Sequence, residues 1–156
     1  MALSGTINGT TANDKITAKI TWSAVQNKTE NYSDITATLT YSRTNSGYTT
    51  GGKWSGSLSV GSTGEEITGK YIEITRNSNT VAITCTKRVY HAADGTLSVK
   101  ISATGKIAGT TLTSTTIGAT VTLDTIPRAS SITSAGAVML GNACDVRWTP
   151  NSSIFR

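Results

Sequence analysis

The chain has few of the residues that catalytic and metal sites need. Its 156 residues include one histidine and two cysteines, and only 15% of them are charged. Cys85 and Cys144 lie far apart and lack the paired spacing of a zinc site, so we expect neither a bound metal nor a disulfide. The single histidine, His91, is expected in an exposed turn, where it has no nucleophile to activate.

Two segments that resemble known motifs do not meet the chemical requirements of those motifs. Glu65 and Glu66 follow a turn-like segment, and adjacent residues of a strand point to opposite faces, so they do not form a glycosidase pair. Residues 47–53 match the glycine and lysine spacing of a phosphate-binding loop. However, Trp54 replaces the metal-binding hydroxyl, and a strand follows instead of a helix. The sequence therefore predicts no catalytic residue and no cofactor, and a protein that is not an enzyme.

Long apolar runs and clusters of one charge are also missing. No segment reaches the length of a membrane span, and the N-terminus has no basic segment followed by an apolar one. We therefore expect no membrane insertion and synthesis as an intracellular chain. The net charge is +5, but lysines and arginines are spread singly, with Lys87 and Arg88 the only adjacent pair. Nucleic-acid binding usually needs a basic cluster or stripe, so we expect no nucleic-acid partner.

Serine and threonine are abundant and make up about a third of the chain. Between them apolar residues recur at every second position, as in residues 15–25, which is the period of a strand with one buried face. The same alternation recurs in residues 34–42, 54–60, 71–75, 80–86, 96–103 and 119–125, with 4–9 as a weaker opening strand. About eight strands predict an all-β protein, a two-sheet antiparallel β-sandwich of the immunoglobulin or fibronectin III type, with a small barrel as the alternative.

Short polar segments separate these strands. Asp94-Gly95 is the strongest of the turn signals, because a type I′ turn needs positive φ at both central residues. We expect it to join a strand that ends near Tyr90 to one that starts at Thr96.

The segment TLDTIPRASS, residues 122–131, predicts a domain boundary. Pro127 lacks an amide hydrogen and restricts the residue before it to an extended conformation, so it should lie at the exit of a strand. We predict a sandwich over residues 1–125, a linker over 126–131, and an incomplete second β module or C-terminal extension over 132–156. Two strands alone are only marginally stable in water, so we expect either that these residues fold back on the sandwich or that they begin a further module of a longer chain, and we favour the second.

Two aromatic residues flank the long polar segment at 44–52, and a third lies within it. Tyr41, Tyr48 and Trp54 lie beside many hydroxyl side chains, and aromatic faces next to hydroxyls are suited to sugar rings. They are therefore candidate glycan-binding residues. The alternative is that Tyr41 and Trp54 belong to the core and only Tyr48 is exposed.

Two segments resemble a known protein family. VYHAADGTLSVKISATG (89–105) and TLDTIPRASSIT (122–133) are similar to segments of minor structural proteins of tailed phages with long non-contractile tails. The resemblance covers roughly residues 70–150. Ala92 and Ala93 depart from it, since the family often has Asn-Ala there.

The resemblance implies a role in the virion. It suggests a component of the tail tip or a tail fibre that anchors or presents host-contact modules, assembled in the bacterial cytoplasm. Its implied partners are other phage structural proteins and further copies of the chain itself. No catalytic residues are carried over from the family. The alternative function is that of a carbohydrate-binding module for bacterial cell-surface polysaccharide.

Overall fold

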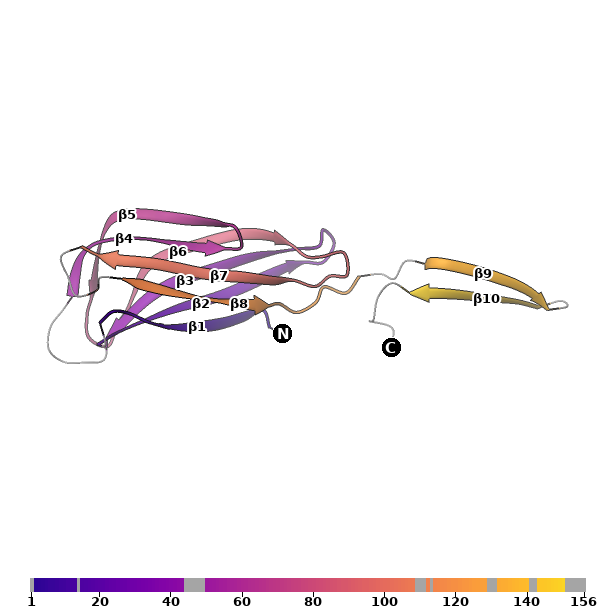
Figure 1. Ribbon diagram of the computed structural model, residues 1–156, viewed down its shortest axis with the longest axis horizontal. Helices are drawn as coiled ribbons and strands as arrows, with labels where there is room; N and C mark the ends of the chain where they lie inside the picture. The colour runs from indigo at the N-terminus through magenta and orange to yellow at the C-terminus, as the bar shows by residue number, and fades with distance from the viewer. Residues whose placement is uncertain are drawn as a thin grey trace.

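The chain forms two antiparallel sheets of four strands each, with a separate two-stranded hairpin (Figure 1). The computed structural model describes the backbone and side chains of residues 2–13, 15–43, 50–108, 112 and 114–128, and the backbone alone of residues 132–140 and 143–150. These residues include no helix, and hence none that could span a membrane. The strands of the sandwich are β1 (Ser4–Thr10), β2 (Ile16–Asn27), β3 (Tyr32–Arg43), β4 (Thr50–Val60), β5 (Thr63–Ile74), β6 (Asn79–Tyr90), β7 (Ser98–Ile107) and β8 (Thr115–Thr122).

The strand order confirms the predicted β-sandwich. The first sheet has the order β1-β2-β3-β6 and the second the order β5-β4-β7-β8. The chain crosses between the sheets after β3, β5 and β6, and the other connections join neighbouring strands. Without β1, the remaining three and four strands have the arrangement of fibronectin type III domains.

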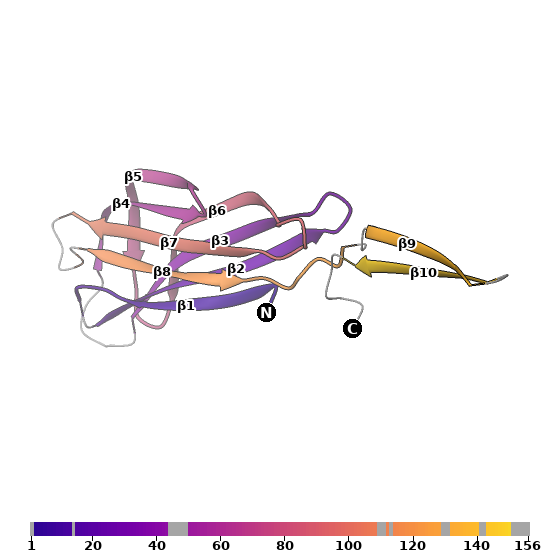
Figure 2. The same ribbon diagram turned by 45° about the vertical axis from the view of Figure 1, so that its right-hand side comes forward.

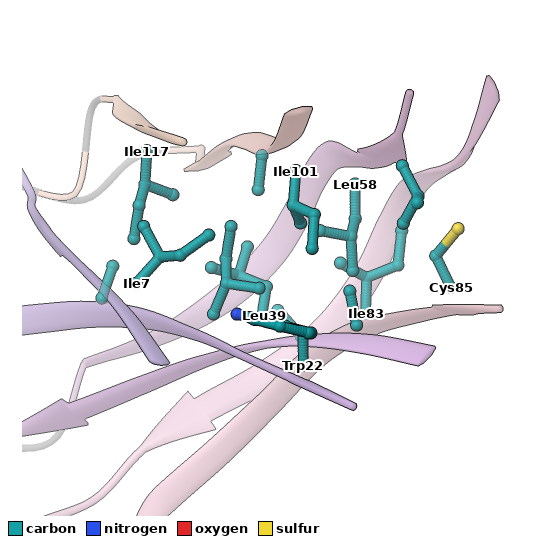
Figure 3. Packing of buried hydrophobic residues seen from close by; sticks show 14 of the residues in the cluster. Ile7, Trp22, Leu39, Leu58, Ile83, Cys85, Ile101 and Ile117 are labelled. Carbon is teal, nitrogen blue, oxygen red and sulfur yellow. The ribbon is translucent and has the colours of Figure 1, made fainter. Parts of the chain in front are cut away.

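The core lies between the two sheets and follows from the alternation of the sequence. In β2 every second side chain from Ile16 to Ala24 is buried, and the residues between them face outward. Burial of one large aliphatic side chain stabilises the fold by about 1.5–3 kcal/mol, so this alternation decides which face of each strand turns inward. Figure 3 shows the two sets of side chains meeting: Ile7, Trp22, Leu39 and Ile83 from the first sheet, and Leu58, Ile101 and Ile117 from the second.

The outer faces are covered by hydroxyl side chains that bond across neighbouring strands. The hydroxyl oxygens of Thr36 and Thr86 are 2.9 Å apart, and those of Ser59 and Ser102 also 2.9 Å apart. Such cross-strand pairs contribute about 0.2–1 kcal/mol each relative to alanine pairs. Further pairs are Thr17–Ser42, Thr38–Thr84, Ser57–Thr104 and Ser98–Thr122. The abundance of serine and threonine thus stabilises both sheets without adding charge.

Along one side of the sandwich the edge strands β1 and β8 lie next to each other (Figure 2). An antiparallel bridge joins Thr11 to Thr115 and a parallel bridge joins Ala2 to Leu123. Exposed strand edges are templates for unwanted pairing. The two bridges connect β1 and β8 near both ends, so the edges of these strands are partly occupied.

Along the other side, charged side chains connect β5 to β6. The Lys70 ammonium donates to the carbonyl oxygen of Ala82 at 2.8 Å, and Lys87 forms an ion pair with Glu65 at 2.7 Å. The turn-like segment before Glu65 and Glu66 ends earlier than the sequence suggests, because β5 begins at Thr63 and includes both residues. Glu65 points toward β6 at the edge, where a carboxylate stays hydrated while it binds a lysine.

The turn predicted at Asp94-Gly95 does connect consecutive strands, but it does not form a hairpin. β6 and β7 belong to different sheets, so the segment crosses from one sheet to the other. Gly95 has φ +82°, whereas Asp94 is not among the described non-glycine residues with positive φ. A type I′ turn needs both, so this turn type is wrong.

The remaining strands, β9 (Ile132–Leu140) and β10 (Ala143–Pro150), pair with each other in an antiparallel hairpin. In the described part of the chain they join neither sheet of the sandwich. The assignment of residues 132–156 to a second β module stays a prediction.

Candidate functional site

The segment that leaves the sandwich is held against it beyond the end of β8. Leu123 and Ile126 are both fully buried. The N–H of Leu123 donates to the carbonyl oxygen of Leu97, and the N–H of Ile126 to that of Gly95, each at 3.0 Å. Residues 123–126 therefore belong to the sandwich. The predicted closing strand, 119–125, is displaced, because β8 spans Thr115–Thr122, and the predicted linker 126–131 starts within the folded domain.

His91 lies at the centre of this region and is buried, so the expectation of an exposed turn histidine is wrong. Its Nδ1 is 2.8 Å from the carbonyl oxygen of Gly95, and its Nε2 is 2.7 Å from the hydroxyl oxygen of Ser33. A carbonyl can only accept, so Nδ1 carries the hydrogen, and in the neutral ring Nε2 accepts from Ser33. Ser33 is completely buried on β3. The imidazole thus ties the β6–β7 connection to the core.

Gly95 brings the two parts of the chain together. Its carbonyl oxygen accepts from the His91 ring and from the N–H of Ile126. Its φ of +82° is strained for any residue with a Cβ, and a Cβ there would overlap the carbonyl oxygen of Ile126. Thr96 donates both its N–H and its hydroxyl to Asp94, and these bonds lower the pKa of the Asp94 carboxyl.

The connection between β2 and β3 approaches from the other side. Asn31 has φ +60°, and its side-chain amide donates to the carbonyl oxygens of His91 at 3.2 Å and Ala92 at 3.0 Å. The backbone carbonyl of Asn31 accepts from the N–H of His91 at 2.9 Å. The left-handed conformation of Asn31, which asparagine tolerates better than most residues, aims the side chain at this corner.

Two further side chains fasten the leaving segment to the same loop. Gln26 donates through its side-chain amide to the carbonyl oxygen of Asp124. Arg128, the last residue before the next gap in the described chain, donates from Nη1 to the carbonyl oxygen of Lys28 at 3.1 Å. We call the contacts among residues 26–33, 91–97 and 123–128 the exit junction. Hydrogen bonds hold the leaving segment at four residues: Leu123, Asp124, Ile126 and Arg128.

The side chains of the exit junction form structural hydrogen bonds. Its one histidine uses both ring nitrogens in structural hydrogen bonds, and its only buried hydroxyl partner is Ser33. The described residues contain no group of three or more His, Cys, Asp or Glu side chains that could hold a metal ion. Among the described residues, the hydrogen bonds of the exit junction fix the course of the backbone, and none of them activates a nucleophile.

Two of the three predicted glycan-binding residues lie in the core and not at a surface. Tyr41 and Trp54 are fully buried, and the indole N–H of Trp54 donates to the hydroxyl oxygen of Tyr41 at 3.2 Å. Burial raises the pKa of the Tyr41 hydroxyl. Neither ring can stack on a sugar, so the prediction that these two residues bind a glycan is wrong. Both residues occupy inward-facing positions of their strands, β3 and β4. Tyr48 lies outside the described residues.

An open groove of about 400 Å³ lies on the second sheet. Its lining residues include hydroxyl side chains of β4, β7 and β8, with Glu66 of β5 and Lys106 of β7 among them. None of its described lining residues is aromatic, so these residues provide hydrogen bonds without a stacking surface.

The two segments on which the family resemblance depends meet at the exit junction. Residues 89–105 contribute His91 and Gly95, and residues 122–133 contribute Ile126. The sequence marked Gly95 as a turn residue and Pro127 as a strand exit, but it gave no sign that Gly95 contacts Ile126, the residue before this proline. The sequence does not single out Ser33 or Asn31. Nothing in the local pattern marks a serine of a strand, or an asparagine of the turn before it, as the partner of a distant loop.

Comparison with known proteins identifies no family. The chain matches no protein-family model, and no curated protein or solved structure is significantly similar to it. What the protein does must therefore be inferred from its own residues.

Proposed function

We propose that this protein is a non-enzymatic structural component of a phage virion, located in the tail tip or a tail fibre, which holds the modules that follow it. The observation that carries the proposal is the exit junction. Its hydrogen bonds and the buried side chains of Leu123 and Ile126 fix the chain as it leaves the sandwich. A module that transmits or resists force gains from such a fixed exit, because a flexible tether would let the next module swing.

The outer faces and edges of the sandwich also suit a virion component, which is assembled once and then remains exposed to the surroundings of the particle. Its outer faces are joined by hydroxyl pairs, and both sides of the sandwich are joined by bridges or by lysine contacts. These contacts protect the edges against uncontrolled strand pairing. We expect partners among other phage structural proteins, including further copies of this chain, to bind through outer faces and loops.

Immunogold electron microscopy of purified phage particles tests the proposal. An antibody raised against the sandwich should label the tail tip or the fibres, and preincubation with the purified protein should remove the label. Particles that carry no label on any tail structure, although the antibody recognises the folded protein, would refute the proposal.

The alternative role in carbohydrate binding loses two of the three ring residues that suggested it. With Tyr41 and Trp54 in the core, a sugar site on this chain needs another exposed ring. The described lining residues of the open groove on the second sheet include no such ring.

A further inference from the structure

Six side chains form two adjacent rows across the outer face of β2, β3 and β6. Val25, Asp34 and Arg88 are register partners in one row, and Asn27, Tyr32 and Tyr90 are register partners in the next. The rows are two residues apart along each strand, so all six side chains share one face. We call these six residues the tyrosine platform. With strands about 4.8 Å apart, it spans roughly 10 Å across the sheet, which is the scale of one or two sugar rings.

The platform has one exposed ring beside a buried one. Tyr90 keeps 66% of its surface exposed, whereas Tyr32 keeps 8%. The two rings meet edge to face, with centroids 5.7 Å apart and planes at 71°. Aromatic pairs favour this geometry, so Tyr32 fixes the position of the exposed ring. Single exposed aromatic residues are common on proteins, and the distinguishing feature here is the ordered set of groups around this one.

Arg88 and Asp34 hold each other in a fixed geometry next to these rings. The guanidinium of Arg88 lies 3.7 Å above the centroid of the Tyr32 ring. Its Nε donates to Oδ1 of Asp34 at 2.9 Å and its Nη2 to Oδ2 at 3.1 Å. The bond from Arg88 lowers the pKa of the Asp34 carboxyl, so the carboxylate remains an acceptor at neutral pH. Its charge and that of the arginine cancel locally.

The other end of the second row is ordered as well. The side-chain amide of Asn27 donates to the hydroxyl oxygen of Tyr32 at 2.9 Å and to Oε2 of Glu30 at 3.0 Å. The backbone N–H of Glu30 donates in turn to the side-chain oxygen of Asn27 at 3.0 Å. The platform therefore combines an exposed ring with planar polar groups that need little reorganisation on binding, which lowers the entropic cost of association.

We propose that the tyrosine platform is a binding site for a neutral saccharide, in which a pyranose ring stacks its C–H face on Tyr90 and its hydroxyls bond to Asp34 and Arg88. A carboxylate accepts from neighbouring hydroxyls and a guanidinium donates to ring or hydroxyl oxygens, so the pair matches the mixed donors and acceptors of a sugar. A neutral ligand is favoured because the paired charges offer no net attraction to an ion. This site is separate from the predicted residues Tyr41, Tyr48 and Trp54 and does not depend on a role in the virion.

Nuclear magnetic resonance titration of the full chain tests the site, with cellotetraose and chitotetraose as neutral probes and tetragalacturonate as the acidic one. A neutral probe should shift the amide resonances of Arg88, Tyr90 and their partners on β3 and leave those of β4 and β7 unchanged. Tyr90→Ala should weaken binding about tenfold or more, whereas Tyr90→Trp should retain it.

Tyr71→Ala provides the matched control. Tyr71 is 68% exposed on β5 of the other sheet, so this change removes an equally exposed ring without touching the platform. The dispersion of the amide spectrum shows directly that each variant is folded. The proposal is overturned if no neutral probe shifts the platform resonances, if the acidic probe binds more tightly than both neutral ones, or if Tyr71→Ala weakens binding as much as Tyr90→Ala.

Discussion

Replacing Gly95 with alanine tests whether the exit junction contributes to the stability of the sandwich. Gly95 has φ +82°, and a left-handed conformation costs a non-glycine residue about 1–2 kcal/mol. A Cβ would also overlap the carbonyl oxygen of Ile126, so the leaving segment must move away. That movement breaks a backbone hydrogen bond that contributes about 0.5–1.5 kcal/mol and exposes part of a side chain whose full burial contributes about 1.5–3 kcal/mol. We expect the free energy of unfolding to fall by about 3–5 kcal/mol in total.

Gly69→Ala separates the backbone strain from the lost contacts. Gly69 has φ +73°, close to that of Gly95, but a Cβ there would meet no atom within 4 Å. This variant should therefore lose only the conformational cost of about 1–2 kcal/mol. Urea unfolding of both variants, followed by tryptophan fluorescence, measures the difference. Equal losses for the two variants would show that the leaving segment does not contribute to the stability of the sandwich.

Three further changes test other parts of the structure. Ile126→Ala should lower the free energy of unfolding in urea by about 2–5 kcal/mol, as in a core, and a loss below about 0.5 kcal/mol would instead place Ile126 in a linker. Tyr41→Phe removes the acceptor of the buried Trp54 N–H, so urea unfolding should show a loss of about 1–3 kcal/mol, and an unchanged midpoint would contradict that bond. The Asp34 carboxyl should titrate below its ordinary pKa in carbon-detected magnetic resonance and return toward it in Arg88→Gln. The pKa of Asp34 is lower in the folded than in the unfolded state. The ion pair therefore stabilises the fold at pH values above the unfolded-state pKa, and this stabilisation is lost as the pH falls through the folded-state pKa.

The regular part of the fold was predictable because one local rule governs it. Alternation of apolar and polar residues gave all eight strands of the sandwich and, for β2, which face is buried. The errors lie where other forces compete with that rule. β5 starts at Thr63, before its apolar residues, because pairing with β4 and contacts with β6 hold a polar segment in the sheet.

The candidate site was less predictable because its contacts join distant segments. The sequence marked His91 as a turn residue, since polar and small residues surround it, yet burial of Ser33 on β3 provides a partner that makes an interior position favourable. Ile126 was assigned to a linker because Pro127 follows it. Its N–H donates to the carbonyl oxygen of Gly95 across the junction, and its side chain is fully buried, so long-range contacts that the local sequence does not show keep the segment within the domain.

The aromatic residues show the same division. Tyr41 and Trp54 follow the buried phase of their strands, and the sequence left open whether they faced inward or flanked a binding loop. Tyr90 ends β6 in the exposed phase, and its neighbours Tyr32, Arg88 and Asp34 come from positions that only strand register brings together.

The sequence by itself determined that this chain forms strands, which side chains of β2 are buried, and that the last strand of the sandwich ends before Pro127, because these properties depend on the local period and on backbone chemistry. Only the tertiary structure decided which strands pair, that β6 and β7 lie in different sheets, that His91 supports the exit of the chain, and that Tyr90 stands in an ordered platform. Each of these depends on contacts between residues far apart in the sequence, whose free energy exists only once the strands have paired and the sheets have packed.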